Sequence, residues 1–179
     1  MRDMDGALLE GTLRDGTPVY VRPLLHSDRE TFAKWFTGLS DRTKRSRFLQ
    51  GKGRKLSETS LDQLVDAVDQ HDHVAVAVIA PDVAGAGEEY VGGGRFVRMS
   101  DDPSTAEVAV TIADSYQGLG AGSLVMRALT QRAREEGVRT FMATMLEENE
   151  ASRRMMSHAG TVVRDDVSDG VREYAVRID

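Results

Sequence analysis

Three glycines lie close together in the segment Gln117-Gly-Leu-Gly-Ala-Gly-Ser123. The residues before this segment have the pattern of a strand, and those after it have the spacing of a helix. Glycines at a strand-to-helix turn let backbone N–H groups approach an anion closely, and the first helical turn adds unpaired donors and the positive end of the helix dipole. The pattern therefore predicts a cradle for a phosphate or a pyrophosphate.

Spacing distinguishes three kinds of cradle. A P-loop requires Lys and then Ser or Thr after its last glycine, but Ser123 follows Gly122 directly and no Lys is near. A dinucleotide-binding turn lies directly after its strand and has its third glycine one residue later than here, which leaves Glu147 as the feature that favours it. The third form, Gln/Arg-x-x-Gly-x-Gly/Ala, is satisfied by Gln117, Gly120 and Gly122.

A single carboxylate, Glu107, stands in the otherwise apolar run that ends at Ile112. Partial burial in such a strand would raise its pKa toward the value that a general base needs. Two interpretations remain open, a catalytic base or a carboxylate at a strand end that faces water. Glu147 and Glu148, which follow a later strand, are the substitutes for the base role.

Hydrophobic periodicity and turn residues predict the elements that position these side chains. Strands are expected at 17–24, 73–80, 89–97, 105–112, 140–146, 161–165 and 171–178. A first helix is expected after a capping box of Ser27 and Glu30. Further helices are expected at 40–48, at 56–68, at 120–136 with Gly137 as its end, and from Asn149 as N-cap to Gly160. The order predicts an α+β fold with an antiparallel meander and one parallel crossover.

Length and composition set the class of protein. The 179 residues, 40% hydrophobic and 29% charged, predict one domain over 17–179 after a polar leader at 1–16. A net charge of −6 has the wrong sign for a general nucleic-acid binder. The absence of cysteine excludes disulfides, thiolate metal sites and cysteine nucleophiles. Since neither a signal peptide nor an apolar run of about 20 residues is visible, a cytoplasmic protein without membrane attachment is expected.

At its glycine turn the chain resembles the GNAT superfamily of acyl-CoA-dependent N-acyltransferases. The likeness covers about residues 17–178, because the predicted order of elements is the one expected of a GNAT domain. Residues that look like the family are Glu107, Tyr116 and Gln117, the glycines of the turn, and Asn149 with Met155, Ala159 and Gly160. The segments Arg14-Asp-Gly-Thr-Pro-Val19 and Val21-Arg-Pro23 are similar to bacterial protein-lysine acetyltransferases of the Pat type.

The resemblance implies a mixed, mostly antiparallel central sheet flanked by helices, with acetyl-CoA as co-substrate. Pantetheine would insert between Val108–Ile112 and Thr140–Met145, held by backbone groups of Val110 and Ile112. The resemblance places Asn149 against the pantetheine and Glu107 in the base role. The pyrophosphate would lie along the turn, at Gln117, Gly118, Leu119, Gly120, Ala121, Gly122 and Ser123.

The implied reaction is transfer of an acetyl group to a primary amine, of a small molecule or of a protein lysine, by direct attack in a ternary complex. Met156, expected beside the pantetheine, stands where many GNAT enzymes have a tyrosine that protonates the departing thiolate. This departure favours an alternative, a non-catalytic acyl-CoA sensor or partner-binding module. A dinucleotide-dependent oxidoreductase is the third hypothesis.

Two charged segments have further interpretations. Residues 41–55 hold seven basic residues and one acid, which is typical of a solvated helix face, of a surface that recruits an acidic partner, or of a phosphate contact. His71-Asp72-His73 has metal-ligand residue types, but no third ligand is evident, so no metal site is expected.

Overall fold

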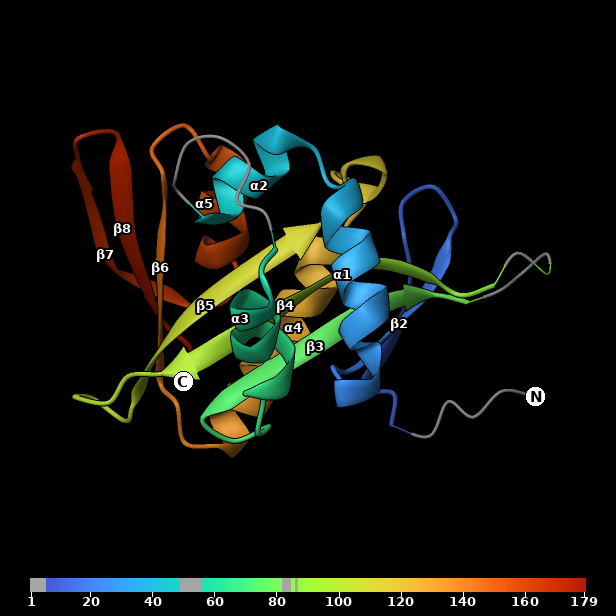
Figure 1. Cartoon of the computed structure of the whole chain (residues 1–179). Coiled ribbons are helices and arrows are strands. Elements are labelled where there is room, and N and C mark those ends of the chain that lie inside the picture. Colours follow the sequence, from blue (N-terminus) through green and yellow to red (C-terminus); the bar gives the residue numbers. More distant parts are fainter. Residues whose placement is uncertain (1–5, 49–55, 82–84, 86) are drawn as a thin grey trace.

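The computed structural model describes residues 6–48, 56–81, 85 and 87–179, and its centre is one eight-stranded sheet (Figure 1). The strand order is β1-β2-β3-β4-β5-β6-β8-β7, and every neighbouring pair is antiparallel except β5 and β6. The strands are β1 (Leu9–Thr12), β2 (Pro18–Pro23), β3 (His73–Ala80), β4 (Glu89–Arg98), β5 (Thr105–Ile112), β6 (Thr140–Leu146), β7 (Thr161–Ser168) and β8 (Val171–Arg177). The predicted α+β fold with one parallel crossover is confirmed.

Helices cover both faces of the sheet. The helices are α1 (Arg29–Gly38), α2 (Asp41–Phe48), α3 (Glu58–Leu61), which continues as a π-helical turn over Asp62–Asp66, α4 (Ala121–Glu135) and α5 (Glu150–Ser157). In Figure 1, α1 and α3 lie in front of the sheet and α4 lies behind it. No helix in the described ranges is long and apolar enough to cross a membrane.

The central strand β3 has apolar side chains on both faces, so helices must pack against both faces of the sheet. Its side chains alternate between the faces, as in any strand, and both sets are apolar. Val74, Val76 and Val78 belong to the core cluster under α4, whereas Ala75 and Ala77 belong to the cluster with Phe32 and Leu61 on the other face. Small residues on this second face let α1 and α3 approach closely.

The strands β5 and β6 are paired only at their beginnings. Thr105–Glu107 pair with Thr140–Met142, after which β5 continues beside β4 and β6 continues beside β8. In Figure 1 the two strands separate toward the top of the view, where α2 and α5 lie near their ends. The helix α2 contacts both strands. The space between the diverging strands is where pantetheine was expected to insert.

Two local expectations were wrong. The capping box of Ser27 and Glu30 does not form; instead Asp28 accepts a hydrogen bond from the Leu25 N–H (2.8 Å) and pairs with Arg22 (2.7 Å). The stretch expected as a polar leader contains β1, which pairs with β2 and extends the sheet by one strand. The sequence of β1 contains a glycine and only one β-branched residue, so its composition does not indicate a strand.

Candidate functional site

The turn between β5 and α4 forms the wall of a surface groove. Gly118 and Gly120 have φ angles of +76° and +101°, which side chains with a Cβ rarely adopt, and Gly120 is the N-cap of α4. A side chain at Gly122 would come 3.2 Å from the sulfur of Met155 on α5. The glycines are therefore required by the backbone path and by close packing, and the N-terminus of α4 lies at the groove.

Most residues predicted to bind the cofactor line this one groove, which has a volume of about 330 Å³. They are Val110, Ile112, Gln117, Gly118, Gly120, Gly122, Ser123 and Asn149. Asn149 also caps α5 as expected, because its side chain accepts a hydrogen bond from the Ser152 N–H (3.1 Å).

Two predicted residues, Leu119 and Ala121, belong to the turn but do not line the groove. Ala121 is buried, and Leu119 packs against the main core cluster. The carbonyl of Leu119 accepts a hydrogen bond from the Arg14 N–H (3.0 Å), and the Arg14 guanidinium donates to the Gly118 carbonyl (2.9 Å). Arg14 thus holds the outside of the turn and brings a positive charge to the groove.

A second cavity continues from the groove between the diverging strands. It holds Glu107 at one end and Met156 in its wall. The two spaces share five lining residues: Ser46, Arg47, Val110, Ser152 and Met155. The expectation that Glu107 is partly buried was wrong, because its side chain is exposed. It faces Arg47. Burial lowers the pKa of the Arg47 guanidinium below its usual value, and the charge of Glu107 opposes part of this shift.

Helix α2 is fastened to the glycine turn by one carboxylate. Asp114 accepts hydrogen bonds from the Ser40 N–H (3.0 Å), the Ser40 hydroxyl (2.6 Å) and the Thr43 hydroxyl (2.8 Å). Burial alone would raise the pKa of Asp114, but the hydrogen bonds from Ser40 and Thr43 lower it. Gln117 continues the connection, since its amide donates to the Thr43 hydroxyl (2.9 Å) and to the Ile112 carbonyl (3.1 Å).

Comparison with known protein families identifies the family of this chain. Residues 19–162 match the family described as acetyltransferase (GNAT) domain. The chain belongs to the GNAT family of acetyltransferases. This GNAT domain is 36% identical over 162 residues to the acetyltransferase PA5475 of Pseudomonas aeruginosa, covering 90% of this chain and 84% of that protein.

Relatives of the Pat type are also similar. The chain is 36% identical over 165 residues to acetyltransferase Pat of Mycolicibacterium smegmatis and spans about half of its length, 47%, with 92% of this chain covered. The GNAT domain of S. lividans PAT superposes with a TM-score of 0.80 at 28% identity, over 94% of this chain and 96% of that one. The structure of yncA from Salmonella typhimurium, solved with acetyl-CoA, has a TM-score of 0.68 at 17% identity, over 90% and 94% of the two chains, and shares the fold.

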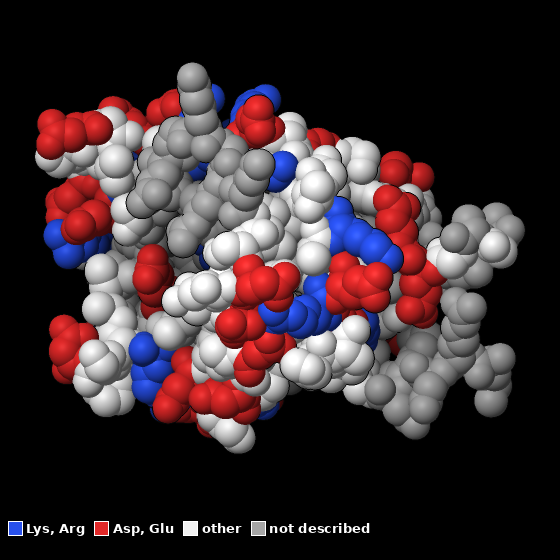
Figure 2. Space-filling model, in the orientation of Figure 1, with Lys and Arg blue, Asp and Glu red and all other residues white. Residues whose placement is uncertain are grey.

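The part of the groove that α2 and α5 supply was not predicted from the sequence. Arg42, Thr43 and Ser46 of α2 and Ser152 of α5 line it. The one available signal was the basic run at 41–55, for which a phosphate contact was one interpretation. Its residues 49–55 lie outside the described residues. Lys44 points away to the Thr37 carbonyl (3.1 Å), and acidic and basic side chains are interspersed over α1 and α3 in Figure 2.

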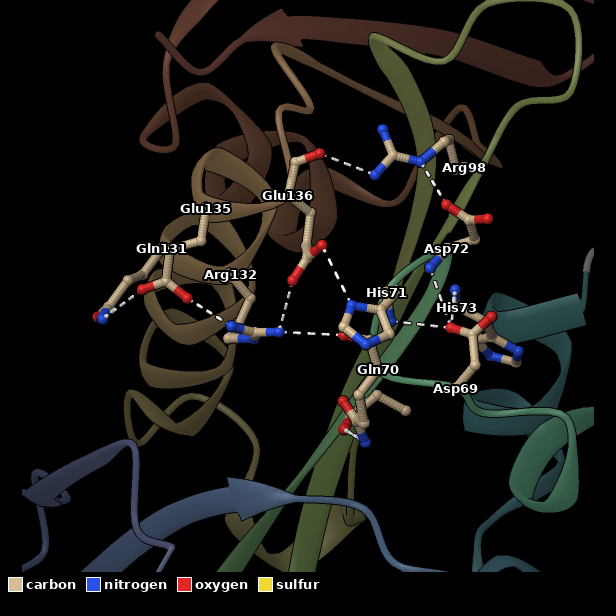
Figure 3. Close-up of polar contacts among 11 residues, drawn as sticks. Asp69, Gln70, His71, Asp72, His73, Arg98, Gln131, Arg132, Glu135 and Glu136 are labelled. Carbon is tan, nitrogen blue, oxygen red and sulfur yellow. Dashed lines mark hydrogen bonds and ion pairs between the residues drawn. The ribbon is translucent and has the colours of Figure 1, made fainter.

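The segment His71-Asp72-His73 has a structural role in this GNAT domain (Figure 3). His71 Nδ1 lies 3.3 Å from a carboxylate oxygen of Glu136 near the end of α4, and Asp72 pairs with Arg98 (2.7 Å). His73 instead contacts Arg95 (3.1 Å). Within the described ranges, no three His, Cys, Asp or Glu side chains gather as metal ligands.

Proposed function

We propose that this GNAT domain transfers an acetyl group from acetyl-CoA to a primary amine by direct attack in a ternary complex. The proposal rests on the continuity between the groove at the α4 N-terminus and the cavity that holds Glu107. One continuous space can hold an anionic head at the glycine turn and an extended arm between β5 and β6. The similarity to Pat and to the acetyl-CoA complex of yncA supports this choice of donor.

The pyrophosphate would bind to the backbone N–H groups of the turn and of the first turn of α4. Arg14 and Arg42 line the same groove, so the local charge is positive although the chain has a net charge of −6. The pantetheine would lie against Val110 and Ile112 of β5, whose backbone groups beyond Glu107 are not paired with β6. A backbone N–H directed at the thioester oxygen would stabilise the oxyanion, a contribution of about 3 kcal/mol.

Glu107 would act as the general base. An alkyl ammonium group has a pKa of about 10.4, so it must lose a proton before it can attack. The proton passes to the Glu107 carboxylate, the amine attacks the carbonyl carbon, and the C–S bond breaks as the C–N bond forms. The second proton of the nitrogen neutralises the thiolate, whose pKa near 8.5 makes it a tolerable leaving group without a tyrosine at Met156.

The acceptor would be an amine of a small molecule or of a protein lysine. A domain over 17–179, extended by β1, would suffice for the reaction, since the groove and the Glu107 cavity are built within it. A cytoplasmic location is proposed because a chain without cysteine suits a reducing compartment.

Release of free CoA thiol tests the function directly. Purified protein is incubated with acetyl-CoA and a panel of lysine peptides, polyamines and amino acids. Saturable, amine-dependent thiol release with an acetylated product supports the proposal. Binding of acetyl-CoA without thiol release in the presence of any of the amines would identify an acyl-CoA sensor, the alternative that Met156 in place of a tyrosine favours. Thermal stabilisation by NAD but not by CoA would overturn both.

Asp114→Ala should weaken acetyl-CoA binding about tenfold. The substitution removes the hydrogen bonds that fasten α2 to the turn, each of which stabilises by about 1 to 2 kcal/mol. Arg42, Ser46 and Arg47 would then leave the groove wall. Titration calorimetry measures the affinity, with the exposed Asp101→Ala as control. Unchanged affinity in Asp114→Ala would show that α2 does not shape the groove.

A further inference from the structure

A third, smaller pocket of about 30 Å³ opens beside the Glu107 cavity on the α1 and α3 side of the sheet. Its wall is aromatic, with Phe32, Trp35, Phe36 and Tyr90, and it also holds Arg47 and Arg95. Arg47 and Ala109 line both this pocket and the Glu107 cavity. A molecule whose amine lies at Glu107 can therefore extend a small group into this pocket.

The sheet register places Arg95 close to Glu107. Glu107 and Ala109 are two residues apart on β5, so they share the face that α1 and α3 cover. Arg95 on β4 pairs with Ala109, and Val97 pairs with Glu107. Arg95 is therefore the diagonal neighbour of Glu107, at a typical spacing of about 7 to 8 Å between such positions. A short acceptor can reach both side chains.

Among the described residues, the hydrogen-bond partners of Arg95 are uncharged. Its guanidinium donates to the Leu64 carbonyl (2.9 Å) and lies 3.1 Å from His73 Nε2. Burial and the charge of Arg95 lower the pKa of His73 to about 4, so this ring is neutral near pH 7. Burial and the charge of Arg47 lower the pKa of Arg95 itself to about 9. No carboxylate of the described residues forms an ion pair with Arg95, although a desolvated cation is normally paired.

The aromatic wall contains a buried donor, the indole N–H of Trp35. The ring centroid of Trp35 lies 4.8 Å from that of Tyr90 and 5.6 Å from that of Phe32. The indole Nε1 of Trp35 is buried and has no hydrogen-bond partner in the described part of the chain. A buried donor without a partner is costly, and a bound acceptor atom would remove that cost.

We infer that the acceptor amine carries a carboxylate, which binds to Arg95 in the aromatic pocket while its amine faces Glu107. The inference rests on the proposed function and narrows its substrate class. The carboxylate can come from a free amino carboxylate or from an acidic residue beside a lysine in a peptide. Both sources present the same two groups, an amine and an anion separated by a short spacer.

A homologous series of ω-amino carboxylates, from β-alanine to 6-aminohexanoate, tests the inference against the matching amides. The wild-type protein should prefer carboxylates over amides by about 10- to 100-fold in kcat/KM, the range of a charge-assisted hydrogen bond. Arg95→Gln should reduce this preference to about one, with the KM for acetyl-CoA unchanged, and Arg95→Lys should restore part of it. Arg127→Gln, an equal change of charge on exposed α4 surface, should keep the full preference.

Two further measurements are needed. One identifies the source of the carboxylate, and the other distinguishes failure of this inference from failure of the proposed function. Lysine hexapeptides with either Glu or Gln beside the lysine are compared as acceptors. If the wild type has a higher kcat/KM than Arg95→Gln for the Glu peptide alone, the anion belongs to a peptide. Binding of the N-acetylated carboxylates and amides to the CoA-loaded protein is measured by calorimetry, so the inference is tested even if no amine is acetylated. Equal binding of carboxylates and amides by the wild type, or an equal loss of both in a folded Arg95→Gln, would overturn it.

Discussion

Glu107→Gln is expected to lower kcat by at least about 100-fold with a cognate amine, because general-base catalysis typically contributes 10²- to 10⁴-fold. Gln has nearly the same shape as Glu but cannot take a proton from an ammonium group. The Kd for acetyl-CoA should stay within about twofold, since Glu107 lies at the end of the cavity away from the glycine turn. Steady-state thiol release measures kcat, and titration calorimetry measures the Kd.

The base role depends on the position of Glu107 rather than on its burial. The side chain is exposed and lies in the cavity that continues from the groove, so an amine can reach it from solvent. Arg47 stands opposite and compensates the carboxylate charge. Glu147→Gln is the matched control, because Glu147 is also an exposed carboxylate but lines neither the groove nor the Glu107 cavity. If the two variants turn over equally, Glu107 is not the base.

Glu107 was expected to be partly buried but is exposed, because the burial of this side chain does not follow from the hydrophobic periodicity of β5. The flanking residues Ala106 and Val108 are buried under α4, as an apolar strand predicts. The opposite face of β5 is covered only in part, because β6 diverges there after Met142. Whether a carboxylate on that face is buried depends on where α2 lies, and this is a tertiary contact that alternation along one strand does not encode.

Local chemistry was predictable where one segment determines it. The glycine spacing, the Asn149 cap and the Gly137 end of α4 each follow from backbone requirements within a few residues, and each is present in the structure. The groove wall made by α2 was not predictable in this way. Thr43 and Gln117 are 74 residues apart in sequence, and only the packing of α2 against the sheet brings them to 2.9 Å.

Gly94→Ala should strongly destabilise the folded protein. Gly94 lies on β4 beneath α4, and a Cβ there would come 2.5 Å from Val125 Cγ1 and 3.0 Å from Leu129 Cδ1, both fully buried. Because both side chains are fully buried, α4 is expected to shift away from the sheet. Overpacking of this kind costs about 3 kcal/mol, which corresponds to a decrease in Tm of about 6 to 12 °C for a chain of this size.

Gly38→Ala is the control for Gly94→Ala. Gly38 is the last residue of α1, and no atom lies within 4 Å of a Cβ added there. The Tm of Gly38→Ala should therefore stay within about 2 °C of the wild-type Tm. The Gly94 variant should also bind acetyl-CoA more weakly, because a displaced α4 carries its N-terminal N–H groups away from the groove. If Gly94→Ala instead has the same Tm as Gly38→Ala and binds acetyl-CoA as tightly as the wild type, then the contact of α4 with β4 does not hold the glycine turn in place.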